Sequence, residues 1–287
     1  MADGAAGLLA PAKVNLTLHV TGRRDDGYHL LDSLVAFADL GDRLTVGPGD
    51  GLRVTGPFAA GVPTDNRNLI RRALAVVGTT RNVALDKRLP HPAGLGGGSS
   101  DAAAALRAIR AAPSEAELLA LGADLPVCLA GPDGVWRMQG VGEAVRPVAT
   151  PGPLPAVLVN PGVPVPTGGV FAALDRRDNP GMGALPRWAD RAEWLSWLAV
   201  QRNDLERPAV ATVPTIGAVL DAIRAGGAAV ARMSGSGGTC FGLYPTDAAA
   251  AAAAAALQRS GWWVRACVLG GAGQDDGSGV AGVPGER

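Results

Sequence analysis

Polar and apolar residues alternate along an early segment of the chain, residues 13–20. The apolar positions are Val14, Leu16, Leu18 and Val20, and the polar positions are Lys13, Asn15, Thr17 and His19. An extended strand turns two such sets to opposite faces. The segment therefore predicts a strand with one polar face, which either belongs to a functional site or is the solvent side of an edge strand.

Shorter segments with the two-residue period of a strand or the 3.6-residue period of a helix follow through the rest of the chain. Alternating or apolar runs predict strands near residues 30–38, 43–46, 82–89, 156–160, 228–233, 239–244 and 262–268. Helical spacing predicts helices near residues 67–77, 99–111, 115–121, 168–175, 190–200, 215–225 and 248–258. The third helix opens with the capping box Ser114-x-x-Glu117, and Asp247 is the expected N-cap of the last. These patterns indicate a mixed α and β protein of two domains, divided in the proline- and glycine-rich residues 147–155.

The most informative segment is residues 92–106, Pro-Ala-Gly-Leu-Gly-Gly-Gly-Ser-Ser-Asp-Ala-Ala-Ala-Ala-Leu. Its glycines disfavour regular structure, and the alanine-rich continuation from Ser99 favours a helix. A loop that opens into a helix N-terminus offers unpaired N–H groups and the positive end of the helix dipole, which suit phosphate. The alternative interpretation is an ordinary turn with a serine or aspartate N-cap.

Two better-known glycine motifs do not fit this segment. A P-loop requires a lysine directly after its last glycine, but Ser99 follows Gly98. The dinucleotide fingerprint G-x-G-x-x-G requires a final glycine that is missing here. The sequence therefore indicates a third kind of nucleotide loop.

Lysine is rare in this chain, which has two lysines and twenty-four arginines. A lysine ammonium is a compact point charge with chemistry that the arginine fork lacks, so both lysines are candidates for a functional role. Lys13 lies on the polar face of the first predicted strand. Lys87 precedes the glycine loop and either contacts a nucleotide or is a solvated strand residue.

Charge and composition exclude several classes of partner. The net charge is zero without a basic run, which argues against nucleic acid, and no apolar run approaches the ~20 residues that span a bilayer. The first residues lack the basic region of a secretory signal, and three scattered cysteines suit a reducing cytoplasm. Residues 271–287 are rich in glycine and are expected to be a disordered tail.

Three blocks together resemble the GHMP kinases. They are Pro11-Ala-Lys13-Val-Asn15-Leu, the loop and helix that begin at Gly94, and the late glycine loop Met233-Ser-Gly235-Ser-Gly237-Gly-Thr-Cys240-Phe241. The resemblance runs from about residue 8 to 268. It implies an α+β fold with a ribosomal S5 domain 2-like N-terminal domain, residues 1–150, and a ferredoxin-like C-terminal domain, residues 151–270. The active site would lie in the cleft between them.

The resemblance also implies an ATP-dependent kinase that phosphorylates a hydroxyl group of a small molecule. The element Gly27-Tyr28-His29 suits a loop that reads cytosine, so the implied substrate is an alcohol linked to cytidine diphosphate, from isoprenoid precursor biosynthesis. Alternatives are a homoserine- or mevalonate-type kinase, or an inactive member of the fold that senses a ligand. The implied partner is thus a small molecule, and the protein is expected to be a monomer or a weak homodimer.

Residue roles follow from the same resemblance. Asp124 would accept the proton of the substrate hydroxyl, and Lys13 would hold it ionised; a turn or N-cap residue is the alternative for Asp124. The implied cofactors are ATP and Mg²⁺, and no set of protein metal ligands is assigned. The residues that would bind ATP are Pro92, Ala93, Gly94, Leu95, Gly96, Gly97, Gly98, Ser99, Ser100, Asp101, Asn68 and Lys87. The proline after His91 departs from the family pattern, and it predicts an altered entry to the loop.

The implied substrate residues come from both halves of the chain. Tyr28 would stack on the cytosine ring and His29 would hydrogen-bond its edge. Phe171 maps to a second ring-sandwiching position, although a helix core residue is nearly as good an interpretation. The remaining substrate contacts are assigned to Asn15, Thr167, Gly235, Ser236 and Gly237.

Overall fold

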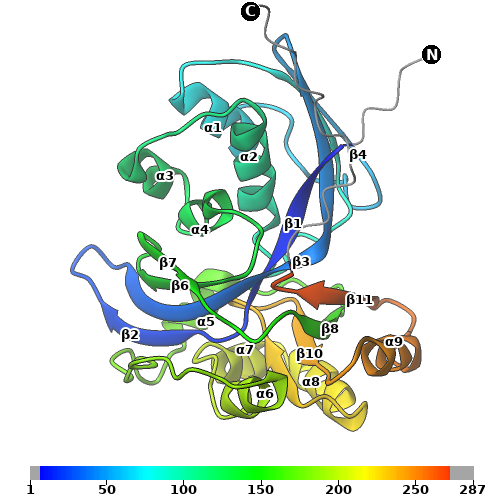
Figure 1. Ribbon diagram of the computed structural model, residues 1–287. Coiled ribbons are helices and arrows are strands. Elements are labelled where there is room, and N and C mark those ends of the chain that lie inside the picture. Colours follow the sequence, from blue (N-terminus) through cyan, green and yellow to red (C-terminus); the bar gives the residue numbers. More distant parts are fainter. Residues whose placement is uncertain (1–6, 272–287) are drawn as a thin grey trace, which may run out of the picture.

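The computed structural model describes residues 7–271 of the 287-residue chain (Figure 1). The strands are β1 (Leu8–Asn15), β2 (His19–Arg23), β3 (His29–Gly47), β4 (Gly51–Thr55), β5 (Asn82–Asp86), β6 (Val135–Gly140), β7 (Ala144–Val148), β8 (Leu154–Asn160), β9 (Val230–Met233), β10 (Cys240–Leu243) and β11 (Trp263–Leu269). The helices are α1 (Leu69–Val76), α2 (Gly97–Ala108), α3 (Glu115–Leu121), α4 (Leu125–Ala130), α5 (Thr167–Ala172), α6 (Arg191–Ala199), α7 (Glu206–Thr212), α8 (Thr215–Ala225) and α9 (Asp247–Ala256). The expected tail lies outside the described residues except for Gly271.

All the strands belong to one mixed sheet built around β3. This 19-residue strand pairs antiparallel with β1, β2, β5 and β6 at successive points along its length. The strand order β4-β5-β3-β11-β8-β10-β9 shows that the sheet continues from β3 into strands of the second half of the chain. A single Cα pair, Ala38 with Leu269, joins β3 to β11.

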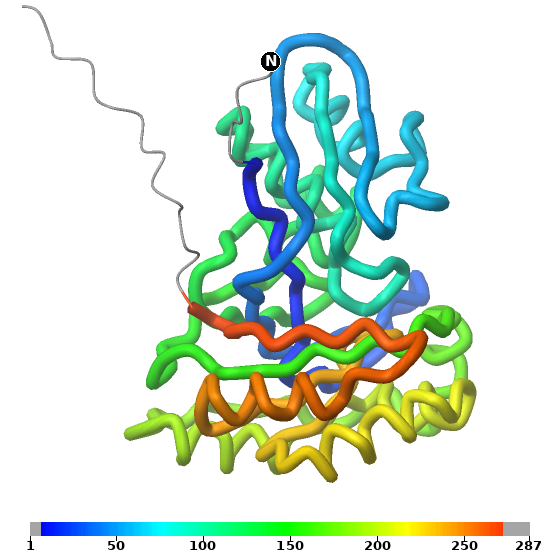
Figure 2. The backbone as a smooth tube through the Cα atoms, turned by 90° about the vertical axis from the view of Figure 1, so that its right-hand side faces the viewer, coloured from blue at the N-terminus to red at the C-terminus, as the bar shows by residue number. Residues whose placement is uncertain are grey.

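Helices cover the sheet in two separate groups. In Figure 1, α1 to α4 lie on one side of β1 and β3, whereas α5 to α9 lie in the lower part with β8 to β10. Figure 2 shows β11 and β8 running side by side above α8 and α9. The expected α+β class is confirmed, while the division into residues 1–150 and 151–270 stays a prediction.

Local capping explains two of the helix starts. At α3 the predicted box forms, because Ser114 Oγ accepts from Glu117 N at 3.4 Å and the Glu117 carboxylate accepts from Ser114 N at 2.7 Å. At α9 the predicted cap is wrong by one residue. The side chain of Thr246 accepts from Ala249 N at 3.2 Å, and Asp247 is the first helical residue.

The first predicted strand is wrong in its extent. The segment 13–20 is divided between β1, which ends at Asn15, and β2, which begins at His19. Between them the chain bends, and Thr17 Oγ1 accepts a hydrogen bond from Leu34 N at 2.8 Å. The four polar residues are at most 3% exposed, so the edge-strand interpretation is also wrong. The polar face is buried inside the protein.

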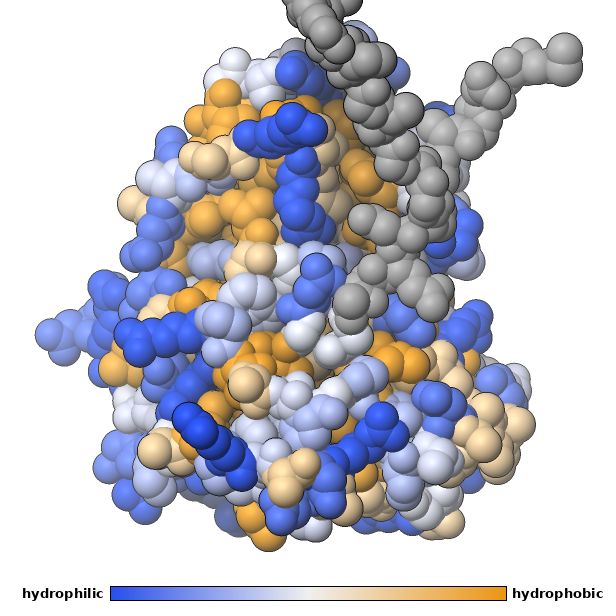
Figure 3. Space-filling view, in the orientation of Figure 1, coloured by the Kyte–Doolittle hydropathy of each residue, from blue (hydrophilic) through white to orange (hydrophobic). Residues whose placement is uncertain are grey.

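The face that Figure 3 shows is neither mainly hydrophobic nor mainly hydrophilic. Charged and apolar residues are interspersed over this face. Among the helices of residues 7–271, none combines the length and the hydropathy that crossing a bilayer requires.

Candidate active site

The polar face of β1 meets the start of α4 at a lysine–aspartate pair. Lys13 Nζ lies 2.9 Å from Asp124 Oδ2 and donates to Asn15 Oδ1 at 2.9 Å. The lysine side chain is 4% exposed and the aspartate side chain 32% exposed. Asp124 holds the N-cap position of α4, but its side chain makes no capping bond. Its carboxylate instead pairs with the lysine while it remains open to a ligand.

A chain of buried hydrogen bonds holds this lysine in place. Asn15 Nδ2 donates to Ser33 Oγ at 2.9 Å, and Ser33 Oγ donates to the carbonyl oxygen of Thr17 at 2.5 Å. Buried polar groups are costly unless they are paired, so such a chain fixes each member in one orientation. The position of the Lys13 ammonium is therefore set by the backbone of the β1–β2 segment.

The glycine loop lies directly on this pair. Helix α2 begins at Gly97, two residues earlier than predicted, and its N-cap is Gly96 at φ +61° without a side-chain capping bond. The interpretation with a serine or aspartate cap is therefore wrong. A Cβ atom on Gly96 would lie 2.8 Å from Lys13 Cε and 3.6 Å from Asp124 Oδ2. Glycine is required here, and the N-terminus of α2 and the ion pair form one site.

The late glycine loop, between β9 and β10, packs against the entry of the first loop. Ser234 Oγ donates to the carbonyl oxygen of Gly94 at 2.8 Å and accepts from Asn15 N at 3.1 Å. A Cβ atom on Gly94 would lie 2.5 Å from Ser234 O, so the two backbones touch. Next along this loop, the hydroxyl groups of Ser236 and Thr167 lie 2.8 Å apart. Predicted site residues from both halves of the chain thus come together.

Two of the three proposed base-reading residues, His29 and Phe171, meet beside this region, whereas Tyr28 lines a separate hollow. The rings of His29, at the start of β3, and Phe171, in α5, stack at 4.7 Å between centroids. His29 Nε2 has no hydrogen-bond partner among the described residues. Burial and the nearby Arg23 and Arg177 guanidinium groups lower the pKa of His29, which keeps its imidazole neutral. Tyr28 is 63% exposed and lines a hollow of about 340 Å³.

Lys87 lies beneath the glycine loop rather than in solvent, so its interpretation as a solvated strand residue is wrong. It is 3% exposed and forms ion pairs with Asp42 and, at 2.8 Å, with Asp101. A Cβ atom on Gly97 would lie 3.0 Å from Lys87 Nζ. Burial raises the pKa of Asp101 to about 7, because it outweighs the attraction of the lysine. The cluster supports the first turn of α2 from inside.

Two other predicted site residues, Asn68 and Ser100, also have structural partners. Asn68 caps α1, where its Oδ1 accepts from Ile70 N at 2.9 Å. Ser100 is 1% exposed, with its hydroxyl 3.5 Å from Cys128 Sγ, whereas Ser99 is only partly buried. The His91–Pro92 peptide at the loop entry is cis, and His91 Nε2 hydrogen-bonds to the Phe58 carbonyl oxygen at 2.8 Å.

Residues 7–271 contain no group of three or more histidine, cysteine, aspartate and glutamate side chains arranged to hold a metal ion. Mg²⁺ in nucleotide sites commonly takes most of its ligands from phosphates and water. The Ser99 hydroxyl, in the first turn of α2, is a ligand group that suits a metal ion held mainly by phosphates and water.

Sequence reasoning missed Ser33, Ser234 and the buried Asp42. None of them stands in a pattern of its own, because their roles depend on partners 18 to 219 residues away. Only the glycine spacing around Ser234 gave a local signal.

Comparison with known proteins supports a single family. The family model described as GHMP kinases N terminal domain matches residues 68–134, and that described as GHMP kinases C terminal matches residues 182–261. The 4-diphosphocytidyl-2-C-methyl-D-erythritol kinase of Dinoroseobacter shibae is 56% identical over 272 residues, which cover 91% of this chain and 93% of the relative. The enzyme of the same name from Paracoccus denitrificans is 52% identical over 264 residues, with 91% and 95% covered.

Solved structures agree with the sequence relatives. A crystal structure of 4-(cytidine 5'-diphospho)-2C-methyl-D-erythritol kinase matches with a TM-score of 0.75 and 40% identity, covering 92% of this chain and 99% of that one. The homoserine kinase of Cytophaga hutchinsonii matches with a TM-score of 0.58 and 18% identity, covering 94% and 98%. At that identity the second match shows the shared fold alone.

Proposed function

The chain belongs to the GHMP kinases, in the family of the 4-diphosphocytidyl-2-C-methyl-D-erythritol kinases, and from this membership we propose that it transfers the γ-phosphoryl group of ATP to the 2-hydroxyl of 4-diphosphocytidyl-2-C-methyl-D-erythritol. This reaction belongs to the non-mevalonate route to isoprenoid precursors. The observation that carries the proposal is the Lys13–Asp124 pair beneath the N-terminus of α2.

Asp124 acts as the base in this proposal. The substrate hydroxyl oxygen bonds to the γ-phosphorus while the bond from that phosphorus to the β-phosphate bridging oxygen breaks, and ADP leaves. A carboxylate is a weak base, but the hydroxyl proton becomes acidic only as its oxygen bonds to phosphorus. A well-placed carboxylate therefore suffices, and the Lys13 ammonium, 2.9 Å away, offsets the negative charge that gathers there.

The glycine loop holds the nucleotide phosphates. The N–H groups of Gly97, Gly98 and Ser99 have no partner within the first turn of α2, which is the general condition of helix N-termini. Mg²⁺ bound to ATP would supply further charge neutralisation, with the Ser99 hydroxyl as its protein-side group. Lys87 and Asp101 act from below, as residues that support the loop.

The cytidyl group binds through His29, Tyr28 and Phe171 in this proposal. A neutral imidazole offers one donor and one acceptor, which suits the amino, ring nitrogen and carbonyl groups along the cytosine edge. Tyr28 and Phe171 supply aromatic faces for stacking. Asn15, Thr167 and the loop 235–237 would contact the methylerythritol and its diphosphate.

The location, the partner and the assembly of the protein are also proposals. We place the protein in the cytoplasm because its three cysteines are unpaired, and each of them is at most 7% exposed. A small molecule is the proposed partner, and a monomer or weak homodimer is the proposed assembly.

The Asp124→Asn variant tests the mechanism. Removal of the base should lower kcat about 10²- to 10⁴-fold, while the Kd for ATP changes only a few-fold. Asp190→Asn is a matched control, because Asp190 is also a helix N-cap but its side chain accepts from Glu193 N in α6. Equal losses of turnover and ATP binding in Asp124→Asn would assign this residue a structural role.

A further inference from the structure

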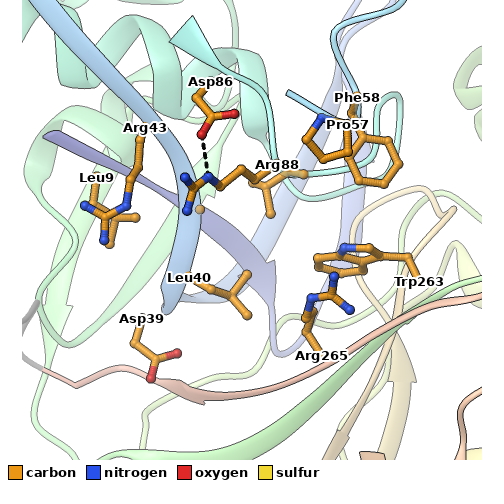
Figure 4. A pocket seen from close by; sticks show the side chains of 12 residues that line it. Leu9, Asp39, Leu40, Arg43, Pro57, Phe58, Asp86, Arg88, Trp263 and Arg265 are labelled. Carbon is orange, nitrogen blue, oxygen red and sulfur yellow. Dashed lines mark hydrogen bonds and ion pairs between the residues drawn. The ribbon is translucent and has the colours of Figure 1, made fainter. Parts of the chain in front are cut away.

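A cavity of about 620 Å³ opens on a part of the molecule that the proposed reaction does not use (Figure 4). It lies where β1, β3 and the end of β5 approach β11. Leu9, Leu40 and Leu89 give it apolar walls, and Phe58 and Trp263 lie near each other on one side of it. Ligand pockets typically have volumes of roughly 300 to 1,000 Å³, and this one combines apolar and aromatic walls with five charged residues.

Most of the cavity lining lies on the face of these strands that is turned away from the glycine loop, while Leu89 also packs toward Gly97 and Phe58 hydrogen-bonds to His91 at the loop entry. Asp42 and Lys87 turn toward α2, where the lysine pairs with Asp101. Neighbouring residues of an extended chain point to opposite faces. Arg43 and Asp86, which are cross-strand partners, therefore face away from α2 and line the cavity. A ligand here would not contact the Lys13–Asp124 pair.

Three guanidinium groups surround the cavity, and they are unequally neutralised. Arg88 pairs with Asp86 at 2.6 Å. Arg43 Nη1 donates to the carbonyl oxygen of Gly7 at 3.2 Å, and Arg265 lies over the ring of Trp263 at 5.6 Å from its centroid. Within residues 7–271, neither Arg43 nor Arg265 forms an ion pair with a carboxylate.

The acidic groups of the cavity wall are both engaged. Asp86 is the partner of Arg88, and Asp39 Oδ1 accepts a hydrogen bond from Val268 N at 3.0 Å. The lining therefore carries a net positive charge, with Arg43 and Arg265 as the arginines left for an anion. Guanidinium groups bind phosphate through paired hydrogen bonds, and a half-buried indole binds a flat ring.

The cavity also spans the two parts of the sheet. Leu9, Arg43 and Arg88 come from the β1–β5 part, and Trp263 and Arg265 come from β11. In the sheet ladder β11 and β3 share one residue pair, Leu269 with Ala38, and a common hydrophobic core packs the two parts together. A ligand in this position would contact both parts of the sheet.

We propose that this cavity is a second ligand site, separate from the active site, that binds a nucleoside monophosphate. The base stacks on Trp263 beside Phe58, and the phosphate binds Arg265 and Arg43. A ring and a phosphate are both needed, because Arg265 lies beside the Trp263 ring and Arg43 lies on the other side of the cavity from Trp263 and Phe58.

Equilibrium dialysis of the full chain with radiolabelled AMP tests the proposal. The active site is first filled with a non-hydrolysable ATP analogue and CDP, so that only a second site is open. One equivalent of AMP should still bind, and ribose 5-phosphate and adenosine should each compete at least 10-fold more weakly than unlabelled AMP. Loss of AMP binding once the active site is filled would overturn the proposal, as would equal competition by ribose 5-phosphate.

Two arginine variants locate the site. Arg265→Ala should weaken AMP binding at least 10-fold, since it removes a charge-assisted phosphate contact. Arg259→Ala is the matched control, because Arg259 also lies over a tryptophan, Trp262, at 4.8 Å but does not line the cavity. It should bind AMP as the unchanged protein does. Normal kinase turnover in both variants would show intact folding, and equal AMP affinities in the two variants would overturn the proposal. Arg43→Ala serves as the second variant, with the same expected loss.

Discussion

Replacement of Gly96 by alanine tests whether the glycine loop packs against Lys13. At φ +61° an alanine costs about 1 to 2 kcal/mol relative to glycine. Its Cβ would also meet Lys13 Cε at 2.8 Å and Lys13 Cβ at 3.1 Å. The lysine cannot swing aside, because Asp124 and Asn15 hold its ammonium and its side chain is 4% exposed. Overpacking of this kind costs about 1 to 3 kcal/mol.

The expected free energy of unfolding of Gly96→Ala is therefore lower by about 2 to 5 kcal/mol, measured by urea denaturation. The ammonium would also be displaced, and misplacement by about 1 Å can lower a rate about 100-fold. We expect kcat to fall by at least tenfold in a coupled assay of ADP release.

Gly98→Ala is the stability control for this variant. Gly98 lies in the first turn of the same helix, and nothing lies within 4 Å of the Cβ that it would gain. Alanine there should stabilise the protein by up to about 1 kcal/mol. A Gly96→Ala protein with unchanged kcat and less than about 1 kcal/mol of destabilisation would refute the reasoning.

Three further variants test other parts of the structure. Burial raises the pKa of Asp101 to about 7, above the usual 3.8. Between these two values the folded protein binds a proton that the unfolded chain releases. The free energy of unfolding should therefore fall as the pH rises from about 4 to about 7. Asp101→Asn should flatten that dependence in urea denaturation, and an unchanged pH profile would contradict the assignment. Phe171→Ala should raise KM for the cytidyl substrate about tenfold and leave KM for ATP within twofold; equal rises in initial-rate kinetics would exclude a cytosine contact. Ser33→Ala leaves Asn15 Nδ2 without its partner, so we expect a loss of about 1 to 3 kcal/mol and a lower kcat, whereas wild-type values of both would show that this hydrogen-bond chain does not position the lysine.

The parts of the site that could be predicted are those with local causes. The glycine loop was recognisable because several glycines before an alanine-rich run exclude regular structure and then favour a helix. The polar face of residues 13–19 was visible as an alternation of residue types. The capping box at Ser114 was likewise contained in four consecutive residues, and it forms as predicted.

The parts that could not be predicted depend on partners distant in sequence. Lys87 can be buried because it pairs with Asp42 and Asp101. No motif or spacing in the sequence identifies either aspartate as a partner of Lys87. The break between β1 and β2 arises from hydrogen bonds to Ser33 and Leu34, so alternation alone suggested one continuous strand. Short elements such as α4 and β4 carry too few residues for a period to appear.

The most direct test of the proposed function is ADP release by the purified protein with MgATP and one alcohol substrate at a time. The substrates compared are 4-diphosphocytidyl-2-C-methyl-D-erythritol, homoserine, mevalonate and galactose. We expect turnover with the first compound alone, and loss of that turnover in Asp124→Asn. Turnover of another substrate in its place, or binding of ATP without turnover of any of the four, would contradict the proposed function.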